Sequence, residues 1–464
     1  MNKIFQVTWN SARQVWVVAS ELAQGDRPPK SQARVASSGL LMALVSALTV
    51  AVAPQAHAQP LANELPTGGT VLIGNATTQL NGNQLLINQA SDRALTQWNS
   101  FNIGAAASVQ INQPTALSSS VNRVLSNDPS RIFGSLTSNG QVVLINPAGV
   151  VFGPTARVDA GSIIASTLNL SNEDFAQGKL NFSNNASTAG TVSNQGLLKA
   201  GQGGYVALIG PRLENTGTLQ ANQGQVLLGA GERIALSRGQ DGLINMSVDA
   251  GALDAQIRLG GVLQANDGSA VVTARAEGAL SKSAINMDGL VEAKGLTAQG
   301  GKIILDSGVN GTTEVTGVLN AGSEAGKGGV VHLLGEQVGL FGHARVNASG
   351  ATGGGEVLVG GDMLGQGSIP TSRAAVLDSD AVIHADAGLS GKGGKVVLWS
   401  DEYTGMYGQI TAKGGQANGD GGFVETSSKD NLQAYGSVDT SARNSRAGEW
   451  LLDPRNVTIV NPGL

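Results

Sequence analysis

The stretch GKGGKVVLWS, residues 391–400, places a glycine-rich quartet directly before an apolar run. The same arrangement returns along the chain, and self-similarity at periods of roughly 20 to 50 residues is typical of stacked structural units. The copies are GQGGYVALIG from Gly201, NQGQVLLGAG from Asn222, AQGGKIILDS from Ala298, GKGGVVHLLG from Gly326, TGGGEVLVGG from Thr352 and GDGGFVETSS from Gly419, with looser copies, NGQVVLIN and NDGSAVVTA, from Asn139 and Asn266.

Aligning the copies on their glycines brings two apolar positions, two residues apart, into register. The residue before them varies freely, from Tyr205 and Gln225 to Lys302. Period-two spacing with one strict face and one permissive face predicts a strand that is half-buried against a core. The first position holds Val142, Val206, Val226, Ile303, Val331, Val357, Val396 and Val424, and the second holds Leu144, Leu208, Leu228, Leu305, Leu333, Val359, Leu398 and, as an exception, Thr426.

A second set of short runs fits another strand in each unit. These runs are LLKA at 197, TLQA at 218, VLQA at 262, LVEA at 290, VLNA at 318 and ITAK at 410. Each unit is therefore a strand, a glycine-rich corner, a strand and a variable return, and glycine supplies the left-handed backbone that corners need. Such units cannot bury an apolar face alone, but stacking them about 4.8 Å apart buries a continuous core. The sequence predicts an all-β, right-handed parallel β-helix (β-solenoid) with extra-helical hairpins or loops of unequal length.

Composition agrees with a repetitive fold. The chain has 464 residues, of which 66 are Gly, and only 4% are aromatic and 14% charged. A large aromatic core is excluded, while a mean hydropathy of +0.02 and the apolar runs argue against disorder. Cysteine is absent, so disulfides, thiol nucleophiles and thiolate metal sites are excluded.

The N-terminus indicates export. Residues 39–53, GLLMALVSALTVAVA, have the length of a signal-peptide core and are too short to span a bilayer. Ala56 and Ala58 flank His57 as a small-x-small cleavage site, so the mature chain is expected to begin at Gln59 after removal of a helical, cleavable segment 1–58. That removal takes five basic and two acidic side chains from totals of 29 and 34, which leaves 24 and 32, a net charge of about −8. An acidic surface disfavours nucleic acid as a partner.

Candidate catalytic and binding chemistry is sparse. The acidic pairs Asp378 with Asp380 and Asp401 with Glu402 do not recur on neighbouring units and are interpreted as solvated loops. The three His of the mature chain lack zinc-ligand spacing and are interpreted as surface residues; they are His332, His343 and His384. No phosphate-binding glycine motif sits between a strand and a helix. We therefore predict no enzyme activity, no metal and no cofactor.

The segment 112–153 is the least repetitive part of the mature chain. In it, NPAG supplies Asn146, Pro147, Ala148 and Gly149 between the apolar runs VVLI and VVFG, which is the chemistry of a type I turn. The purely structural interpretation of NPAG is a corner between two strands.

Several phrases carry a resemblance to a known family. The phrases NRVLSNDPSRIFGSL, INPAGVVFG and DAGSIIASTLNL, within residues 118–168, resemble the secretion domain of two-partner secretion exoproteins, the filamentous-haemagglutinin-like family. EWLLDPRNVTI, residues 449–459, resembles a phrase found downstream in such proteins. Residues 1–38 are similar to the extended signal-peptide region of type V secreted proteins of Gram-negative bacteria. The family's NPNG-type motif maps onto Asn146, Pro147, Ala148 and Gly149, with Ala148 in place of the second Asn, and no NPNL motif is present.

The resemblance implies a secretion domain recognised in the periplasm by an outer-membrane barrel with POTRA domains, after passage through the Sec translocon. The expected organisation is an extended signal peptide over 1–58, the secretion domain over 59–310 and the start of a β-helical shaft over 311–464, which could continue beyond VNPGL. The chain is expected to be a secreted or surface-located adhesin of haemagglutinin type that meets host-cell glycans or surface proteins. The alternatives are the front of a toxin or contact-dependent growth-inhibition exoprotein and, third, a β-helix carbohydrate-active enzyme.

Overall fold

The computed structural model describes residues 5–10, 15–20, 59–183, 190–277, 283–296 and 300–454. The chain divides into two units, Met1–His57 and Ala58–Leu464. In the first, β1 (Phe5–Asn10) pairs antiparallel with β2 (Val15–Ser20). The predicted signal helix and cleavage residues Ala56 and Ala58 lie outside the described residues, and Gln59 opens the described part of the second unit, where it is exposed.

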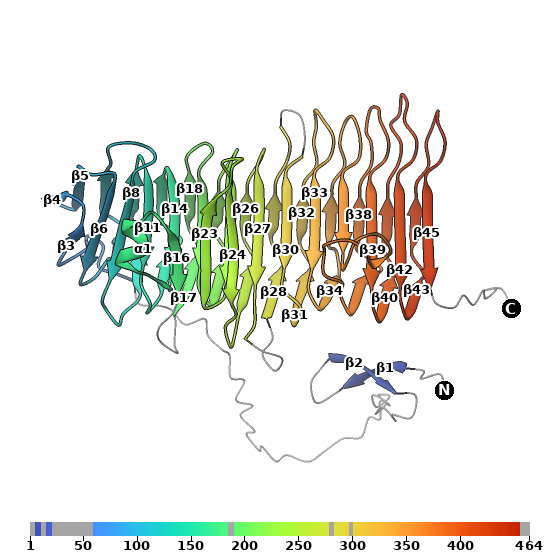
Figure 1. Cartoon of the computed structure of the whole chain (residues 1–464), viewed down its shortest axis with the longest axis horizontal. Coiled ribbons are helices and arrows are strands. Elements are labelled where there is room, and N and C mark those ends of the chain that lie inside the picture. Colours follow the sequence, from blue (N-terminus) through green and yellow to red (C-terminus); the bar gives the residue numbers. More distant parts are fainter. Residues whose placement is uncertain are drawn as a thin grey trace, which may run out of the picture. The chain divides into compact units, whose positions relative to one another are not determined.

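The second unit is a parallel β-helix, as predicted (Figure 1). Each complete coil runs through three strands, one in each of three long sheets, which we call sheets 1, 2 and 3 in the order that the chain visits them. Successive coils pair in parallel register, so the edge of one coil is covered by the next. In the part of the chain that the structure describes, no helix is long and apolar enough to cross a membrane.

Sheet 1 is built from the short runs predicted as second strands, such as LLKA and TLQA. One side chain of each three-residue strand, for example Leu219 or Leu263, points into the core and is fully buried. Its strands are β4 (Ala76–Asn81), β5 (Gln84–Gln89), β7 (Ser108–Asn112), β10 (Ser135–Ser138), β13 (Arg157–Ala160), β18 (Leu197–Ala200), β21 (Thr218–Gln220), β26 (Val262–Gln264), β29 (Leu290–Glu292), β32 (Val318–Asn320), β35 (Arg345–Asn347), β38 (Val382–His384), β41 (Gln409–Thr411) and β44 (Ser437–Asp439).

Sheet 2 holds the apolar runs that follow the glycine corners. In most coils its strand is longer than that of sheet 1, and two inward side chains per strand reach the core. They are β3 (Thr70–Ile73), β6 (Arg93–Trp98), β8 (Ser119–Val124), β11 (Gln141–Ile145), β14 (Ser162–Ser166), β19 (Tyr205–Ile209), β22 (Gln225–Ala230), β27 (Ser269–Ala274), β30 (Lys302–Asp306), β33 (Val330–Leu334), β36 (Glu356–Val359), β39 (Lys395–Ser400), β42 (Phe423–Ser428) and β45 (Glu449–Pro454).

Sheet 3 corrects the prediction of a variable return. The return is itself a strand, because two strands cannot enclose a core and the third side must also bury apolar groups; Val192, Leu213 and Ile257 are at most 2% exposed. Its strands are β9 (Ser130–Ile132), β12 (Val150–Phe152), β17 (Thr191–Asn194), β20 (Arg212–Asn215), β25 (Gln256–Leu259), β28 (Ser283–Met287), β31 (Gly311–Val315), β34 (Gln337–Leu340), β37 (Ala374–Leu377), β40 (Tyr403–Met406) and β43 (Asn431–Ala434).

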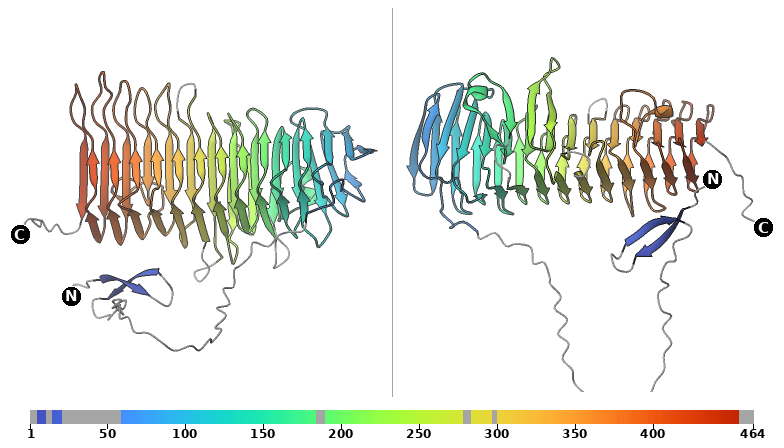
Figure 2. Two further views of the ribbon diagram at one scale, coloured as in Figure 1. Left: turned by 180° about the vertical axis from the view of Figure 1, so that it is seen from behind. Right: turned by 60° about the horizontal axis from the view of Figure 1, so that its bottom comes forward.

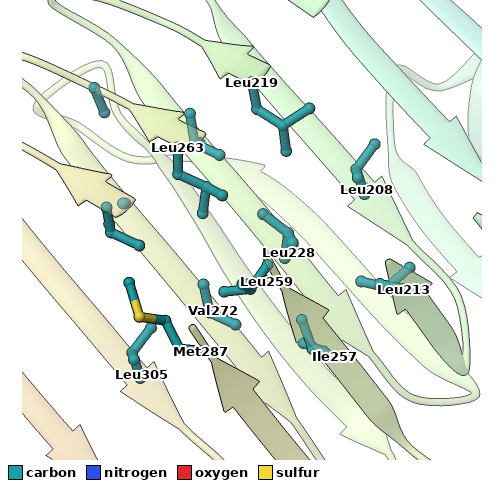
Figure 3. Close-up of a cluster of buried hydrophobic side chains, with 14 of the residues drawn as sticks. Leu208, Leu213, Leu219, Leu228, Ile257, Leu259, Leu263, Val272, Met287 and Leu305 are labelled. Atoms are coloured by element: carbon teal, nitrogen blue, oxygen red, sulfur yellow. The ribbon is translucent and has the colours of Figure 1, made fainter. Parts of the chain in front are cut away.

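The inner core runs along the helix axis. Figure 3 shows side chains from the three sheets meeting there, with Leu228 from sheet 2, Leu263 from sheet 1 and Ile257 from sheet 3. Each buried aliphatic side chain contributes on the order of 1.5 to 3 kcal/mol to folding. A ladder repeated coil after coil therefore stabilises the helix along its length.

An outer sheet covers sheet 2 in the amino-terminal half of the second unit (Figure 2). Its antiparallel strands are β15 (Asn169–Leu170), β16 (Leu180–Ser183), β23 (Arg233–Arg238) and β24 (Ile244–Ala250), joined on the way by helix α1 (Asn172–Ala176). Ser171 caps α1, because its Oγ accepts a hydrogen bond from the Asp174 amide at 2.9 Å. This outer sheet includes the hairpin β23–β24, in line with the predicted extra-helical hairpins.

A second insertion crosses sheet 2 in the carboxyl-terminal half of the second unit. Residues 361–372, which we call the strap, contain the short 3-10 helix η1 (Met363–Gly365), and Ile369 of the strap packs on Leu358, Val397 and Trp399. At the other end of the molecule, β3 and β4 pair antiparallel with β6 and β5 and close the first coil.

Candidate recognition region

The NPAG residues form the corner between β11 and β12. The Gly149 amide donates to the Asn146 carbonyl at 3.0 Å, which closes a four-residue turn, and the Ala148 amide donates to Asn146 Oδ1 at 2.9 Å. Gly149 has φ +131°, a backbone conformation that favours glycine, and an added Cβ would stand 3.3 Å from Pro129 and from the Thr191 carbonyl, which is a tight contact. Of the four residues, Pro147 is exposed, Ala148 is half-buried, and Asn146 and Gly149 are buried.

Asn146 ties this corner to the preceding coil. Its Nδ2 donates to the Asp128 carbonyl and to Ser130 Oγ, both at 3.0 Å, and its amide donates to the Ser166 carbonyl at 3.0 Å in the following coil. All the polar groups of this buried residue are therefore satisfied. Asn146 acts in the folded chain as a clamp between three coils.

Backbone carbonyls of the corner also accept hydrogen bonds from neighbouring coils of the β-helix. The Ser130 amide donates to the Gly149 carbonyl at 3.0 Å, and the Gly190 amide donates to the Pro147 carbonyl at 2.8 Å. The coils on both sides therefore occupy its hydrogen-bonding groups. In the folded state the corner offers a partner little besides the Pro147 ring.

The amino-terminal end of the second unit, where β3 and β4 lie, forms a cap that carries an exposed strand edge. β4 begins sheet 1, pairs on one side with β5, and is exposed from Thr77 to Asn81, including Leu80 at 66% exposure. Behind the cap, Trp98 packs edge-on against Phe101 with ring centroids 5.5 Å apart, and Trp98 Nε1 donates to Asn122 Oδ1 at 3.0 Å. An unpaired edge of this kind is able to add a strand from another chain.

The outer sheet and α1 are held to sheet 2 by apolar packing and by Arg123. This side chain leaves β8 and donates to the Leu170 carbonyl at 2.5 Å and to Asn172 Oδ1 at 2.8 Å. Burial lowers the pKa of Arg123 from its ordinary value. The apolar contacts include Val143, Ile164 and Phe182, each fully buried outside the inner core. The sequence interpretation missed this second core.

The predicted ladder positions lie one over another in sheet 2. Val206 pairs in register with Val226, Val331 with Val357, and Val357 with Val396. The exception at the second position also points inward, where Thr426 Oγ1 accepts a hydrogen bond from Trp450 Nε1 at 2.9 Å. The predicted ladder residues are at 0% exposure, namely Val206, Val226, Ile303, Val331, Val357, Val396, Leu208, Leu228, Leu305, Leu333 and Leu398.

Two flanking positions differ from the prediction of a permissive face. Tyr205 and Gln225 are 4% and 6% exposed because the outer sheet covers them. The signal was present in the sequence: the runs at 142–145 and 205–209 are apolar on both faces, unlike KIILDS at 302–307. Strands that are apolar on both faces are covered on both faces.

The acidic pairs form no catalytic arrangement. Asp378 accepts from the Gly342 amide at 3.0 Å, Asp401 accepts from Thr371 Oγ1 at 2.7 Å, and Glu402 pairs with Arg373 at 3.1 Å. Among the described residues, no three His, Asp or Glu side chains gather as a metal ion would require.

His332 is not the surface residue that the sequence suggested, whereas the His384 side chain is 38% exposed. The His332 side chain is 15% exposed, and its Nε2 lies 3.1 Å from Glu356 Oε1 in the next coil. His384 Nδ1 lies 2.8 Å from Thr411 Oγ1, and burial lowers the pKa of His384. Both are half-buried because side chains of the following coil stack on them; His343 is exposed.

A charged group beneath the strap was also missed. The hydrogen bond with His332 holds the pKa of the Glu356 carboxyl below its usual range, and Lys395 Nζ lies 2.6 Å from Asp362 Oδ1. Glu425 is buried, its two oxygens accept from the Leu364 amide at 3.1 Å, and burial raises its pKa. These contacts hold the strap down.

Comparison with known families gives two matches. A family model described as the TPS secretion domain matches residues 62–326, and one described as the extended signal peptide of the type V secretion system matches residues 1–50.

Relatives of the chain come from Haemophilus influenzae. A heme/hemopexin-binding protein of strain Rd is 30% identical over 212 residues, which cover 44% of this chain and 23% of that protein. A second heme/hemopexin-binding protein of this species is 37% identical over 102 residues, covering 22% and 11%. The chain thus matches less than a quarter of the length of these relatives. The crystal structure of the HMW1 secretion domain from the same species is 32% identical with a TM-score of 0.73, and the match covers 84% of this chain and all of that one.

Proposed function

The chain belongs to the family of TPS secretion domains, and from that premise we propose that residues 59–310 are the part of a two-partner exoprotein that a dedicated outer-membrane transporter recognises. The observation that carries this proposal is the secretion-domain match over 62–326 behind an extended signal peptide over 1–50. The protein is exported through the periplasm to the cell surface or beyond in a Gram-negative bacterium.

The proposed route passes through the Sec translocon and then through a barrel with periplasmic POTRA domains. An unfolded strand from the front of the mature chain adds to a sheet edge of those domains, in the way that extended peptides augment exposed sheets. Each coil that folds outside buries side chains such as Val206 and Leu208, on the order of 1.5 to 3 kcal/mol each. Stepwise burial outside the cell opposes backward movement and gives export its direction.

Within this scheme Asn146, Pro147, Ala148 and Gly149 have a structural role. Their support is the buried clamp of Asn146 and the occupied carbonyls of Pro147 and Gly149. A turn whose polar groups are used by neighbouring coils stabilises the folded secretion domain more than it serves a transporter. In this proposal the transporter instead recognises strands that are still unpaired during export.

We place the boundary between secretion domain and shaft near residue 310. The outer sheet ends at Ala250, and from β31 onward the coils continue with the same three strands and the strap as their main insertion. Residues 311–464 are then the start of a shaft. An acidic rod with long exposed faces suits an adhesin of haemagglutinin type that meets host-cell glycans or surface proteins, and the relatives' names describe binding rather than catalysis.

The test is a pair of segment replacements of nearly equal length. Replacing residues 141–153 with a Gly-Ser segment should abolish export, because the chain loses two strands and the corner of the secretion domain. Replacing the strap, residues 361–372, in the same way should leave export intact. Secretion is measured as full-length protein in the medium of cells that carry the transporter. Unchanged secretion of the first variant would count against the proposal.

A point variant separates the structural role of Asn146 from recognition. Asn146→Ala leaves buried groups unpaired at about 1 to 3 kcal/mol, so the secreted domain should unfold at a lower urea concentration. Binding of the unfolded chain to the purified periplasmic part of the transporter should stay the same. Weaker binding with unchanged stability would assign this residue to recognition instead.

A further inference from the structure

A hollow of about 520 Å³ lies between sheet 2 and the outer sheet. Gln141 and Tyr205 of sheet 2 line it from below, and Lys179, Asn181 and Arg238 line it from the outer layer. Its volume falls in the range of small-molecule sites, which is roughly 300 to 1,000 Å³. The export role proposed above makes no use of this hollow.

Three cations surround the hollow, and no described carboxylate pairs with any of them. Arg93 comes from β6, Lys179 from the turn before β16, and Arg238 from the end of β23. The described residues that line the hollow include no Asp or Glu, and none of the three cations has a described carboxylate oxygen within 4.0 Å. Elsewhere on this acidic chain, cations such as Lys199 and Arg212 do have such partners.

Neutral backbone groups hold the two arginines in place. Arg93 donates to the Ala176 carbonyl at 3.1 Å, and its guanidinium lies so close to Gly178 that an added Cβ would stand 2.4 Å from it. Gly178 has φ +75°, which favours glycine in this turn. Arg238 donates to the Gly242 carbonyl at 2.9 Å. Because carbonyls do not neutralise a guanidinium, the full positive charge of both side chains remains at the hollow.

The floor adds an oriented neutral donor. Ser119 Oγ donates to Gln141 Oε1 at 2.6 Å, and Gln141 Nε2 donates to the Tyr205 hydroxyl oxygen. Burial raises the pKa of Tyr205, so the hydroxyl keeps its proton. Since the oxygen already accepts, the Tyr205 O–H is left to donate. The hollow therefore presents N–H and O–H donors and three positive charges to one space.

We propose that this hollow binds a small sugar that carries an oxyanion group, a carboxylate or a phosphate. The cations and the Tyr205 hydroxyl match the oxyanion, since charge-assisted hydrogen bonds to oxyanions are the stronger class. The Asn181 side chain, whose Nδ2 also donates to Asp174 Oδ1 at 3.3 Å, and the Ser237 hydroxyl line the hollow and match sugar hydroxyls. The Phe175 ring offers an apolar wall. A cationic hollow on an acidic protein concentrates such a ligand.

Calorimetric titration of the secreted chain tests this inference with four probes. Glucose 6-phosphate and glucuronate should both bind, more weakly as salt is raised, and glucose should not bind. Inorganic phosphate should bind more weakly than the sugar phosphate. Equal binding of phosphate alone would overturn the sugar assignment, and absence of binding by both anionic sugars would overturn the site.

Variants locate the binding in the hollow. Lys179→Gln and Arg238→Gln should each weaken binding about tenfold or more, as loss of a charge-assisted hydrogen bond predicts. Arg212→Gln, which removes an equal charge from β20 on sheet 3, is the control and should bind as the parent does. Lys179 is exposed and has no side-chain hydrogen bond or ion pair among the described residues, so its variant should fold normally, which a urea unfolding curve checks. Parent-like affinity in the Lys179 and Arg238 double variant would refute the proposal.

Discussion

The front coils, residues 59–250, and the rear coils, residues 300–454, share one inner core but differ on the outer face of sheet 2. One row of outward positions runs through both: Leu227 of β22 is 1% exposed under the outer sheet, whereas Ile304 of β30 and His332 of β33 are half-buried. Further along the row, the strap covers Val397 and the carboxylate of Glu425. The inner ladder stabilises the β-helix along its whole length. The segments that cover the outer face of sheet 2 make the front coils differ from the rear coils.

The first test asks whether the inner core is truly shared. Val206→Asp in the front and Val396→Asp in the rear each place a carboxylate in a fully buried apolar row, where it has no partner. Each should cost more than about 4 kcal/mol of local stability. Hydrogen exchange should show loss of protection centred on the altered coil, to a similar extent in both variants.

Coils interact mainly with their neighbours, so damage in one place leaves distant coils protected. Tolerance of Asp at one of the two positions, with protection retained there, would break the idea of a common inner core.

The second test sharpens the difference between the outer faces. Leu227→Ala should cost about 2 to 5 kcal/mol, because it opens a cavity between sheet 2 and the outer sheet. Ile304→Ala, in the same outward row, should cost about 1 kcal/mol or less, since water already reaches this side chain. The measurement is the change in the free energy of unfolding from urea titration. Equal losses would mean that the outer sheet adds no core of its own.

The inner ladder was predictable from the sequence and the outer cover was not. Glycine corners followed by period-two apolar residues mark each strand of sheet 2, so Val331 or Val396 could be placed in a row without any coordinates. The strands of sheet 3, such as β12 and β17, are three to five residues long and lack a constant corner before them. Their pattern is too short to distinguish a strand from a return loop.

The candidate recognition region was predictable only in part. The chemistry of Asn146 and Gly149 indicated a turn, yet its hydrogen bonds to Asp128 and Ser130 depend on how two coils stack. The hollow depends on residues as distant as Arg93 and Arg238, which only the fold brings together. Sequence periodicity predicts the repeated coil, but it does not predict where inserted segments pack on the coils.

The third test uses pH to probe the strap. Burial raises the pKa of Glu425 above its ordinary value of 4.5 in the folded chain, so the folded strap binds a proton more readily than the opened one. Its stability should therefore fall as the pH rises above about 4.5. The Leu364 amide partly offsets this effect by donating to the carboxylate, so the change should be smaller than that for Leu227→Ala.

Glu425→Gln is the matched variant, because it keeps an acceptor for Leu364 and does not titrate. Hydrogen exchange at the Leu364 amide is corrected for the pH dependence that an unprotected amide shows. The corrected rate should depend on pH less in the variant than in the parent. The carboxyl groups of Glu356 and Asp362, whose pKa values are lowered, are present in both proteins, so their contributions cancel in the difference. An identical pH dependence in parent and variant would show that Glu425 does not govern the strap.

The smallest effects are expected where front and rear do not differ at all. Lys199 pairs with Asp159 in the front and Lys413 pairs with Asp439 in the rear, each at 3.1 Å between neighbouring coils and with both side chains about half-exposed. Exposed ion pairs contribute little because solvent screens them, so Lys199→Gln and Lys413→Gln should each cost about 0.5 kcal/mol or less, and by equal amounts. Urea unfolding at low and high salt measures both. A clear excess at Lys199 would mean that the front is stabilised through sheet 1 as well, and that the outer sheet is not the whole difference between the two regions.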